Sequence, residues 1–231
     1  MTLDRIEDAI EALKSGSMVL VVDDEDRENE GDIILAAEHA TTAAVAFMVR
    51  YTSGVLCVGI PARRADELEL PLMVARNCDS MGTAYTVTVD LKLGTSTGIS
   101  AADRAATIRG LVNPHTTAGD FNRPGHVFPL RAAQGGVLKR PGHTEAAVDL
   151  TRLAGLHEGG VLAEVVNDDG SMARRPELEI FARTHGLAMV SIADLIAYRR
   201  RHSSLDKTQP ARIANRLKSS SPRIENLEAV S

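Results

Sequence analysis

The sequence predicts an α+β fold, a three-layer αβα sandwich around a mixed β-sheet. Runs of apolar, β-branched residues typical of buried strands alternate along the chain with segments of helical periodicity. Several neighbouring strands are joined by loops too short for a crossover helix, which requires antiparallel pairs within the sheet. The composition is that of a globular protein, 44% hydrophobic and 25% charged, and because only 3% is aromatic we expect an aliphatic core.

The elements of the first half follow from apolar spacing and from cap and turn signals. A first helix, between an N-cap at Thr2 and a stop at Gly16, carries on one face Leu3, Ile6, Ile10 and Leu13. We then expect, in order, strands at 18–22 and 33–37, a helix from Thr41 to near Gly54, a strand at 55–60, a helix at 62–70 and a strand at 85–90. The last of these alternates polar and apolar residues, which indicates one solvent-facing side.

The second half begins with a glycine- and hydroxyl-rich loop, Gly94–Ser100, before a helix that Ser100 and Asp103 mark as a capping box. Residues 113–142 are dense in Gly, Pro and His, so we expect an irregular region; a strand at 126–130 within it would lie at a sheet edge or be interrupted, because of Pro129. The remaining elements are a helix at 144–155, a strand at 161–166, a turn at 167–172, a helix at 176–185, a strand at 187–192 and a helix at 193–201.

Residues 1–202 contain no linker-like stretch and are expected to form one domain. From Ser203 the chain becomes polar and rich in Ser, which predicts a flexible tail over 203–231.

Composition also excludes several classes of protein. The net charge of −5 and the pI near 5.8 argue against a broad nucleic-acid surface. No apolar run approaches the roughly 18–20 residues of a membrane span, and the acidic N-terminus is unlike a signal peptide. Cys57 and Cys78 form no C-x-x-C motif, so neither a disulfide framework nor a structural zinc is expected. A cytoplasmic location is the default.

The most unusual stretch is Asp23–Asp32, with seven carboxylates and one arginine in ten residues between two apolar runs. Such a charge run is also typical of a solvated turn. Extended geometry would place Glu28, Glu30 and Asp32 on one side and Arg27 on the other. Three carboxylates on one side would suit Mg²⁺ or Mn²⁺.

Two identical tetrapeptides, RPGH at Arg123–His126 and at Arg140–His143, are interpreted as Pro-Gly turns that each present an Arg and a His. They are typical of sugar-phosphate contacts or acid–base groups, although a single His is more often structural. The other five histidines have no such setting.

Three weaker signals complete the candidates. The Gly94–Ser100 loop ahead of a helix could bind an anion through its amides. Glu164 lies inside an apolar strand, where a carboxylate is costly unless it is used, so it is a candidate general acid or base; a solvent-facing position is the alternative. Cys57 is interpreted as a small buried hydrophobe that could also line a site. These patterns indicate a divalent metal, a sugar phosphate and acid–base chemistry, without naming a reaction.

Several segments together resemble the 3,4-dihydroxy-2-butanone 4-phosphate synthases of riboflavin biosynthesis. They span roughly residues 3–200 and read DDEDRENEGD, YTSGVLCV, GTAYTVTVD, GTSTGISAADRAATI, RPGHVFPLRA, GGVLKRPGHTEAAVDL and GSMAR. The resemblance implies a lyase that converts D-ribulose 5-phosphate into L-3,4-dihydroxy-2-butanone 4-phosphate and formate. It also implies two Mg²⁺ ions per site, with Mn²⁺ as an alternative, and a homodimer with sites near the subunit interface.

The resemblance also implies residue roles. The metal ligands are Glu28 and His143, and the catalytic residues are His126 and Glu164. The substrate-binding positions are Arg27, Glu28, Asp32, Arg140, Pro141, Gly142, His143, Thr144 and Glu164. Further candidates near the site are Asp23, Glu30, Cys57 and Thr107. We expect Arg140 and Thr144 to hold the phosphate, and the acidic segment to order when metal and substrate bind.

In many bacteria this domain is fused to a GTP cyclohydrolase II, whose zinc site needs cysteines. Residues 203–231 contain none, so we expect a monofunctional enzyme, with a truncated two-domain relative as the alternative. A Mg²⁺-dependent sugar-phosphate isomerase or phosphatase, and a non-enzymatic sugar-phosphate-binding module, are the alternative functions.

Overall fold

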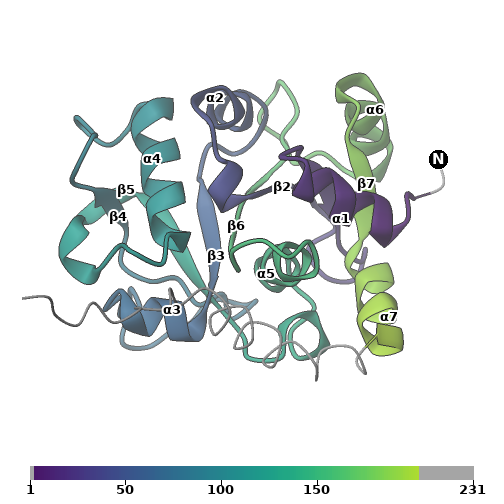
Figure 1. Cartoon of the computed structure of the whole chain (residues 1–231). Coiled ribbons are helices and arrows are strands. Elements are labelled where there is room, and N and C mark those ends of the chain that lie inside the picture. Colours follow the sequence, from purple (N-terminus) through teal and green to yellow (C-terminus); the bar gives the residue numbers. More distant parts are fainter. Residues whose placement is uncertain (1–2, 203–231) are drawn as a thin grey trace, which may run out of the picture.

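The structure of the chain, a computed structural model, describes residues 3–202. Its strands are β1 (Val19–Val22), β2 (Gly31–Ala36), β3 (Cys57–Pro61), β4 (Val89–Leu91), β5 (Phe121–Ala132), β6 (Gly160–Glu164) and β7 (Ala188–Ser191). They form one sheet in the order β4-β5-β3-β6-β2-β1-β7 (Figure 1). The pairs β1–β7 and β3–β5 are parallel and the others are antiparallel, so the predicted mixed sheet is confirmed.

Helices cover both faces of this sheet. They are α1 (Ile6–Lys14), α2 (Thr42–Tyr51), α3 (Ala62–Glu67), α4 (Ala101–Val112), α5 (His143–Leu153), α6 (Arg175–His185) and α7 (Ile192–His202), with short 3₁₀ helices at Ala37–His39, Ala118–Asp120 and Gly136–Leu138. In Figure 1, α5 lies over β6, with α1 and α7 beside it. The predicted α+β sandwich is therefore confirmed.

Strand residues alternate between two apolar cores, one on each face. Val21 and Ile34 pack with α1, α5 and α7 on one side. Leu20 and Ile33 pack on the other side with α2, α3, α4 and α6. This alternation follows from the two-residue period of a strand and makes the central strands apolar throughout.

The region expected to be irregular contains the longest described strand, β5, with 12 residues. The strand predicted at 126–130 is confirmed but extends over 121–132, so the expectation of irregular structure is wrong for that segment. The edge position for Pro129 is also wrong, because β5 lies between β4 and β3 and Pro129 is opposite Val58. The proline is accommodated because its other neighbour, Thr86, only donates to it: the amide and the hydroxyl of Thr86 bond to the Pro129 carbonyl at 3.0 and 2.9 Å. The first RPGH copy is thus part of a strand and is not a turn.

Two further boundaries differ from the prediction. Helix α1 begins at Ile6, because Arg5 is the N-cap and exchanges hydrogen bonds with Asp8, so Leu3 precedes the helix. Of the strand predicted at 85–90, only the end belongs to β4, whereas Tyr85 and Thr86 form isolated bridges. Thr2 and the tail predicted at 203–231 lie outside the described residues, so the domain division stays a prediction. Within residues 3–202, no helix combines the length and apolar character needed to cross a membrane.

Candidate functional site

An acid-lined pocket of about 80 Å³ lies where the β1–β2 connection, the end of β6 and the start of α5 meet. Its lining residues are Arg27, Glu28, Glu30, Asp32, Cys57, Thr83, Tyr85, Leu130, Arg140, His143, Thr144, Leu162 and Glu164. Most of the predicted site residues therefore lie around one pocket.

The strands place these side chains on one face of the sheet. Asp32 of β2 and Glu164 of β6 are direct partners across an antiparallel pair. They share the strand parity of Ile34 and Leu162, which pack on the face that α5 covers. Two opposed carboxylates repel each other unless cations or protons lie between them.

Asp23, Glu28 and His143 form a cluster of the kind that binds a metal. One potential ligand atom from each lies within 4.8 Å of the others. Glu28 Oε2 is 3.4 Å from His143 Nδ1, and Asp32 Oδ1 is 3.7 Å from the same nitrogen. Oxygen donors with one imidazole suit a hard divalent cation.

The His143 ring is oriented by the backbone of β1. Its Nε2 lies 3.2 Å from the carbonyl oxygen of Val21, which fits an Nε2–H donor and leaves Nδ1 facing the carboxylates. Burial disfavours the imidazolium, but Asp32, Glu28 and Asp23 outweigh it and raise the pKa of His143 to about 9. In return, the hydrogen bond from His143 and the charge of Arg27 lower the pKa of Glu28 to about 2, against the effect of burial.

Asp32 is the site carboxylate whose ionised form is least stabilised by its surroundings. Its side chain is almost fully buried, and its Oδ1 has no hydrogen-bond partner among the described residues. Burial, and then the charges of Glu164, Glu28 and Glu30, raise the pKa of Asp32 to about 7, although His143 opposes the shift. Such an oxygen gains a partner only from a proton or a cation.

The acidic segment is not extended, so the predicted separation of Arg27 from the carboxylates is wrong. Residues 25–28 form a turn, which brings Arg27 Nη1 to 2.9 Å from Asp23 and 2.6 Å from Glu28. Asp23 accepts from the amides of Glu28 and Glu30 at 3.0 and 2.9 Å. Arg174 donates to the carbonyls of Glu28 and Asn29.

The second RPGH copy leads into the N-terminus of α5. Arg140 donates to the buried carboxylate of Glu145 at 2.7 Å and also contacts Met81 and Thr83. Gly142 is the N-cap, and a Cβ there would overlap the Arg140 guanidinium. Thr144 and Arg140 line the pocket, whereas Pro141 and Gly142 do not.

His126 lies on β5 and does not line this pocket. Its Nδ1 is 2.7 Å from Asp90 Oδ2, and its backbone amide donates to Asp90 Oδ1 at 2.9 Å. The side chain is 42% exposed. The carboxylate of Asp90 thus fixes the orientation of the imidazole, and an oriented, partly exposed imidazole is a group capable of proton transfer.

The loop Gly94–Ser100 already binds an anion from its own chain. The amides of Ser96 and Gly98 donate to Asp103 Oδ2 at 3.1 and 3.0 Å. Ser100 caps α4 as predicted, but the Asp103 carboxylate turns to this loop and does not complete a capping box. Thr107 is buried in α4, bonded to Leu91 and Asp103, and does not line the pocket.

Sequence reasoning missed four lining residues: the apolar Leu130 and Leu162, and the polar Thr83 and Tyr85, which carry no charge at neutral pH and belong to no acidic or basic motif. Tyr85 lies against Cys57, and burial raises the pKa of both groups, so the thiol stays protonated. Only the place of Thr83 and Tyr85 in the segment Gly82–Asp90, which the resemblance included, could have indicated them.

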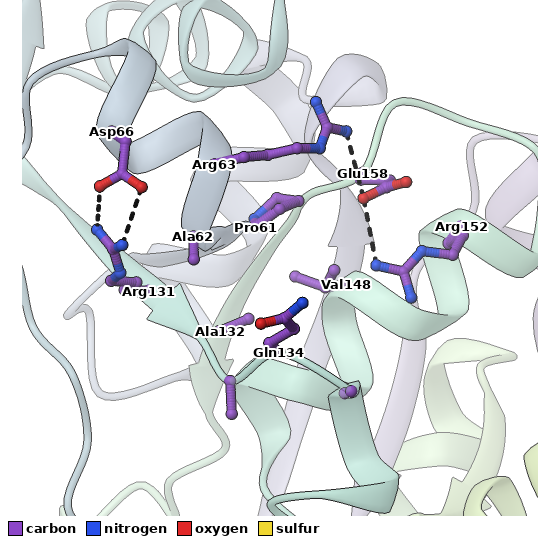
Figure 2. A pocket seen from close by; sticks show the side chains of 13 residues that line it. Pro61, Ala62, Arg63, Asp66, Arg131, Ala132, Gln134, Val148, Arg152 and Glu158 are labelled. Carbon is purple, nitrogen blue, oxygen red and sulfur yellow. Dashed lines mark hydrogen bonds and ion pairs between the residues drawn. The ribbon is translucent and has the colours of Figure 1, made fainter. Parts of the chain in front are cut away.

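A larger hollow of about 440 Å³ lies between α3 and the region before α5 (Figure 2). Its arginines are occupied by carboxylates: Arg131 bonds to Asp66 at 2.6 and 3.0 Å, and Arg63 and Arg152 share Glu158 at 3.4 and 3.2 Å. None of the predicted site residues lines it. The smaller, acid-lined pocket is therefore the candidate site.

Fold and pocket together define the class: an α+β protein whose mixed sheet carries a buried cluster of carboxylates and imidazole beside two arginines. Residues 7–198 match the sequence profile of 3,4-dihydroxy-2-butanone 4-phosphate synthase. The chain belongs to this family.

Relatives share most of the described chain. A 3,4-dihydroxy-2-butanone 4-phosphate synthase of Agrobacterium fabrum is 60% identical over 198 residues, which cover 86% of this chain and 93% of that protein. The riboflavin biosynthesis protein RibBA of Rhodococcus erythropolis is 62% identical over 201 residues, 86% of this chain but only 47% of that protein. This chain thus spans about half the length of that relative.

Solved structures show the same fold. A 3,4-dihydroxy-2-butanone 4-phosphate synthase in complex with two magnesium ions superposes with a TM-score of 0.84 at 46% identity. The match covers 87% of this chain and 99% of that one.

Proposed function

We propose that the chain converts D-ribulose 5-phosphate into L-3,4-dihydroxy-2-butanone 4-phosphate and formate for riboflavin biosynthesis. Membership of the family supports this reaction. The single observation that carries it to the acid-lined pocket is the buried Oδ1 of Asp32, which accepts no hydrogen bond from the described residues and lies beside Glu28 and His143.

The donor set fits Mg²⁺, with Mn²⁺ as an alternative, and Glu28 and His143 are the ligands we propose. Their facing atoms, together with Asp23, lie within 4.8 Å of one another, and the structure with two magnesium ions is similar to this one over most of its length. When bound, the cation acidifies sugar hydroxyls and stabilises negative charge on oxygen. We extend the proposal to two ions per site.

The chain supplies the remaining parts from fixed elements. Arg140 and Thr144 bind the phosphate group; the bond of Arg140 to Glu145 and the position of both residues in the pocket lining support this role. Arg27 and Asp32 face the sugar. Glu164, at the end of β6, accepts and returns protons as one water leaves and the carbon skeleton rearranges. A water then adds back at C4, which departs as formate, so that no water is consumed overall.

We further propose a homodimer in which His126 serves the pocket of the other subunit. The imidazole is half exposed, is held by Asp90 and does not line the pocket of its own chain. These observations support a catalytic role for His126 in a second chain that lies near β5.

The test is incubation of the protein with ribulose 5-phosphate and Mg²⁺. We expect one formate per sugar consumed. Free phosphate would favour a phosphatase, a pentulose or pentose isomer would favour an isomerase, and binding without turnover would favour a sugar-phosphate-binding module. The cytoplasmic location and the monofunctional character stay predictions from composition.

A further inference from the structure

We propose that Ser53 is a positioning residue that holds the Glu164 carboxylate toward the acid-lined pocket, where the proposed lyase reaction uses it. The inference rests on that proposed function. It assigns a role to an uncharged residue on the segment between α2 and β3, which lies in the stretch YTSGVLCV but is not among the residues to which the resemblance gives a role.

The contact joins residues 111 positions apart. Ser53 Oγ donates to Glu164 Oε2 at 2.6 Å, a short bond of the charge-assisted kind. The hydroxyl proton is directed to the carboxylate, because the same Oγ accepts from the amide of Val55 at 3.2 Å. The Ser53 amide also donates to the Glu164 carbonyl at 2.8 Å, so side chain and backbone of Glu164 are held by the same residue.

The segment that carries Ser53 is itself fixed. Thr52 bonds through its hydroxyl to the Met48 carbonyl at 2.6 Å and pairs with Val165 across the strand end. Arg104, a buried guanidinium on α4, donates to the carbonyl of Gly54 at 3.3 Å. Ser53 therefore acts from a rigid support, although its own side chain is exposed.

Glu164 needs such support because its neighbours repel it. Asp32 lies directly opposite on β2, and Glu30 lines the same pocket, so two further carboxylates face Glu164 there. Glu164 is also the last residue of β6. Without a donor, its flexible side chain would turn to solvent. The bond occupies Oε2 and leaves Oε1 for the reacting group.

The test is steady-state kinetics of formate production. Ser53→Ala is expected to lower kcat about tenfold, because a misplaced base transfers protons poorly, while KM for ribulose 5-phosphate changes less than about twofold, since Ser53 acts through Glu164. Two larger variants separate the hydroxyl from the volume: Ser53→Thr should keep most of the activity, and the equally bulky Ser53→Val should behave like Ser53→Ala.

A double-mutant cycle shows whether Ser53 acts through Glu164. Glu164→Asp keeps a carboxylate but withdraws it from the Ser53 hydroxyl. In that background Ser53→Ala should cost less than about twofold in kcat, because the interaction is already lost. Equal losses in both backgrounds, or a Ser53→Ala enzyme with unchanged kcat, would overturn the proposal.

A matched control exists in the turn after β6. Ser171 Oγ donates to Asp169 Oδ1, also at 2.6 Å, but neither residue lines the pocket. Ser171→Ala should leave kcat unchanged. The proposed function is tested separately, with the unmodified protein. If that protein produces no formate, the lyase assignment is wrong and so is the role of Ser53.

Discussion

Asp32 shows how a single residue of this site trades stability for function. A buried carboxylate oxygen without a partner is costly, and natural proteins retain such groups where they bind or react. In the metal-free protein the cost is reduced by a proton, which explains why burial raises the pKa of Asp32 to about 7.

Asp32→Asn is therefore expected to abolish formate production and to stabilise the metal-free protein. The folded state holds the Asp32 proton more tightly than the unfolded state, whose carboxyl pKa is near 3.8. This stabilisation is complete below pH 3.8 and is lost as pH rises through about 7. The gain from Asn should thus be about 4 kcal/mol at pH 8 and near zero at pH 4, measured by urea unfolding with a chelator present. An equal gain at both pH values would contradict the assignment.

His143→Ala tests the metal ligand at the same scale. Loss of the imidazole should weaken Mg²⁺ or Mn²⁺ binding by at least about 100-fold in calorimetric titrations and abolish turnover. His157→Ala is the control, because His157 also pairs with a carboxylate, Glu38 at 3.1 Å, but lies outside the pocket. Unchanged metal affinity in His143→Ala would show that another group binds the ion.

What the sequence reveals at this scale depends on charge. Glu28, Asp32 and Glu164 stand out because carboxylates beside or within apolar runs need an explanation. Ser53 and Thr83 have ordinary polar side chains, and their partners, Glu164 and Arg140, are 111 and 57 residues away. No local pattern signals such contacts.

At the scale of elements, β5 differs most from the prediction, which expects a strand only over residues 126–130. Pro and Gly normally mark turns, and 121–132 contains two prolines and a glycine. The segment forms a strand because Val58 and Thr86, both distant in sequence, supply its neighbours. The helices were predicted more accurately, since caps and apolar spacing are local: Thr41 caps α2 and Gly186 ends α6 in the left-handed conformation, as such signals predict.

A substitution at the N-cap of α5, Gly142→Ala, tests how this helix positions the arginines of the pocket. Gly142→Ala places a methyl group on the Arg140 guanidinium and 3.0 Å from Arg27 Nη2. Both are ends of flexible side chains, so stability should change little, but the displaced arginines should raise KM for ribulose 5-phosphate about tenfold. Gly119→Ala, whose nearest neighbour is 3.7 Å away, should have no kinetic effect. An unchanged KM in Gly142→Ala would show that Arg140 does not bind the phosphate group.

At the scale of the whole molecule, His126 lies outside the acid-lined pocket of its own chain, and the proposed homodimer accounts for this separation. If the proposed homodimer shares its sites, Glu28→Ala and His126→Ala are each inactive but complement one another when mixed subunits reassociate. Half of the dimers are then heterodimers with one intact site, so about a quarter of the wild-type activity should return. Mixtures that stay inactive would place His126 in the site of its own chain or outside catalysis.

The division of the interior by the sheet has a practical consequence for engineering. Asp32, Cys57 and Glu164 all project toward the α5 side, whereas Met48, Ile108 and Leu178 fill the layer behind the strands. Libraries for thermostability should therefore concentrate on the rear layer, where repacked aliphatic side chains are screened from the chemistry by a full thickness of backbone. The same substitutions around α5 would alter the spacing of the reacting groups.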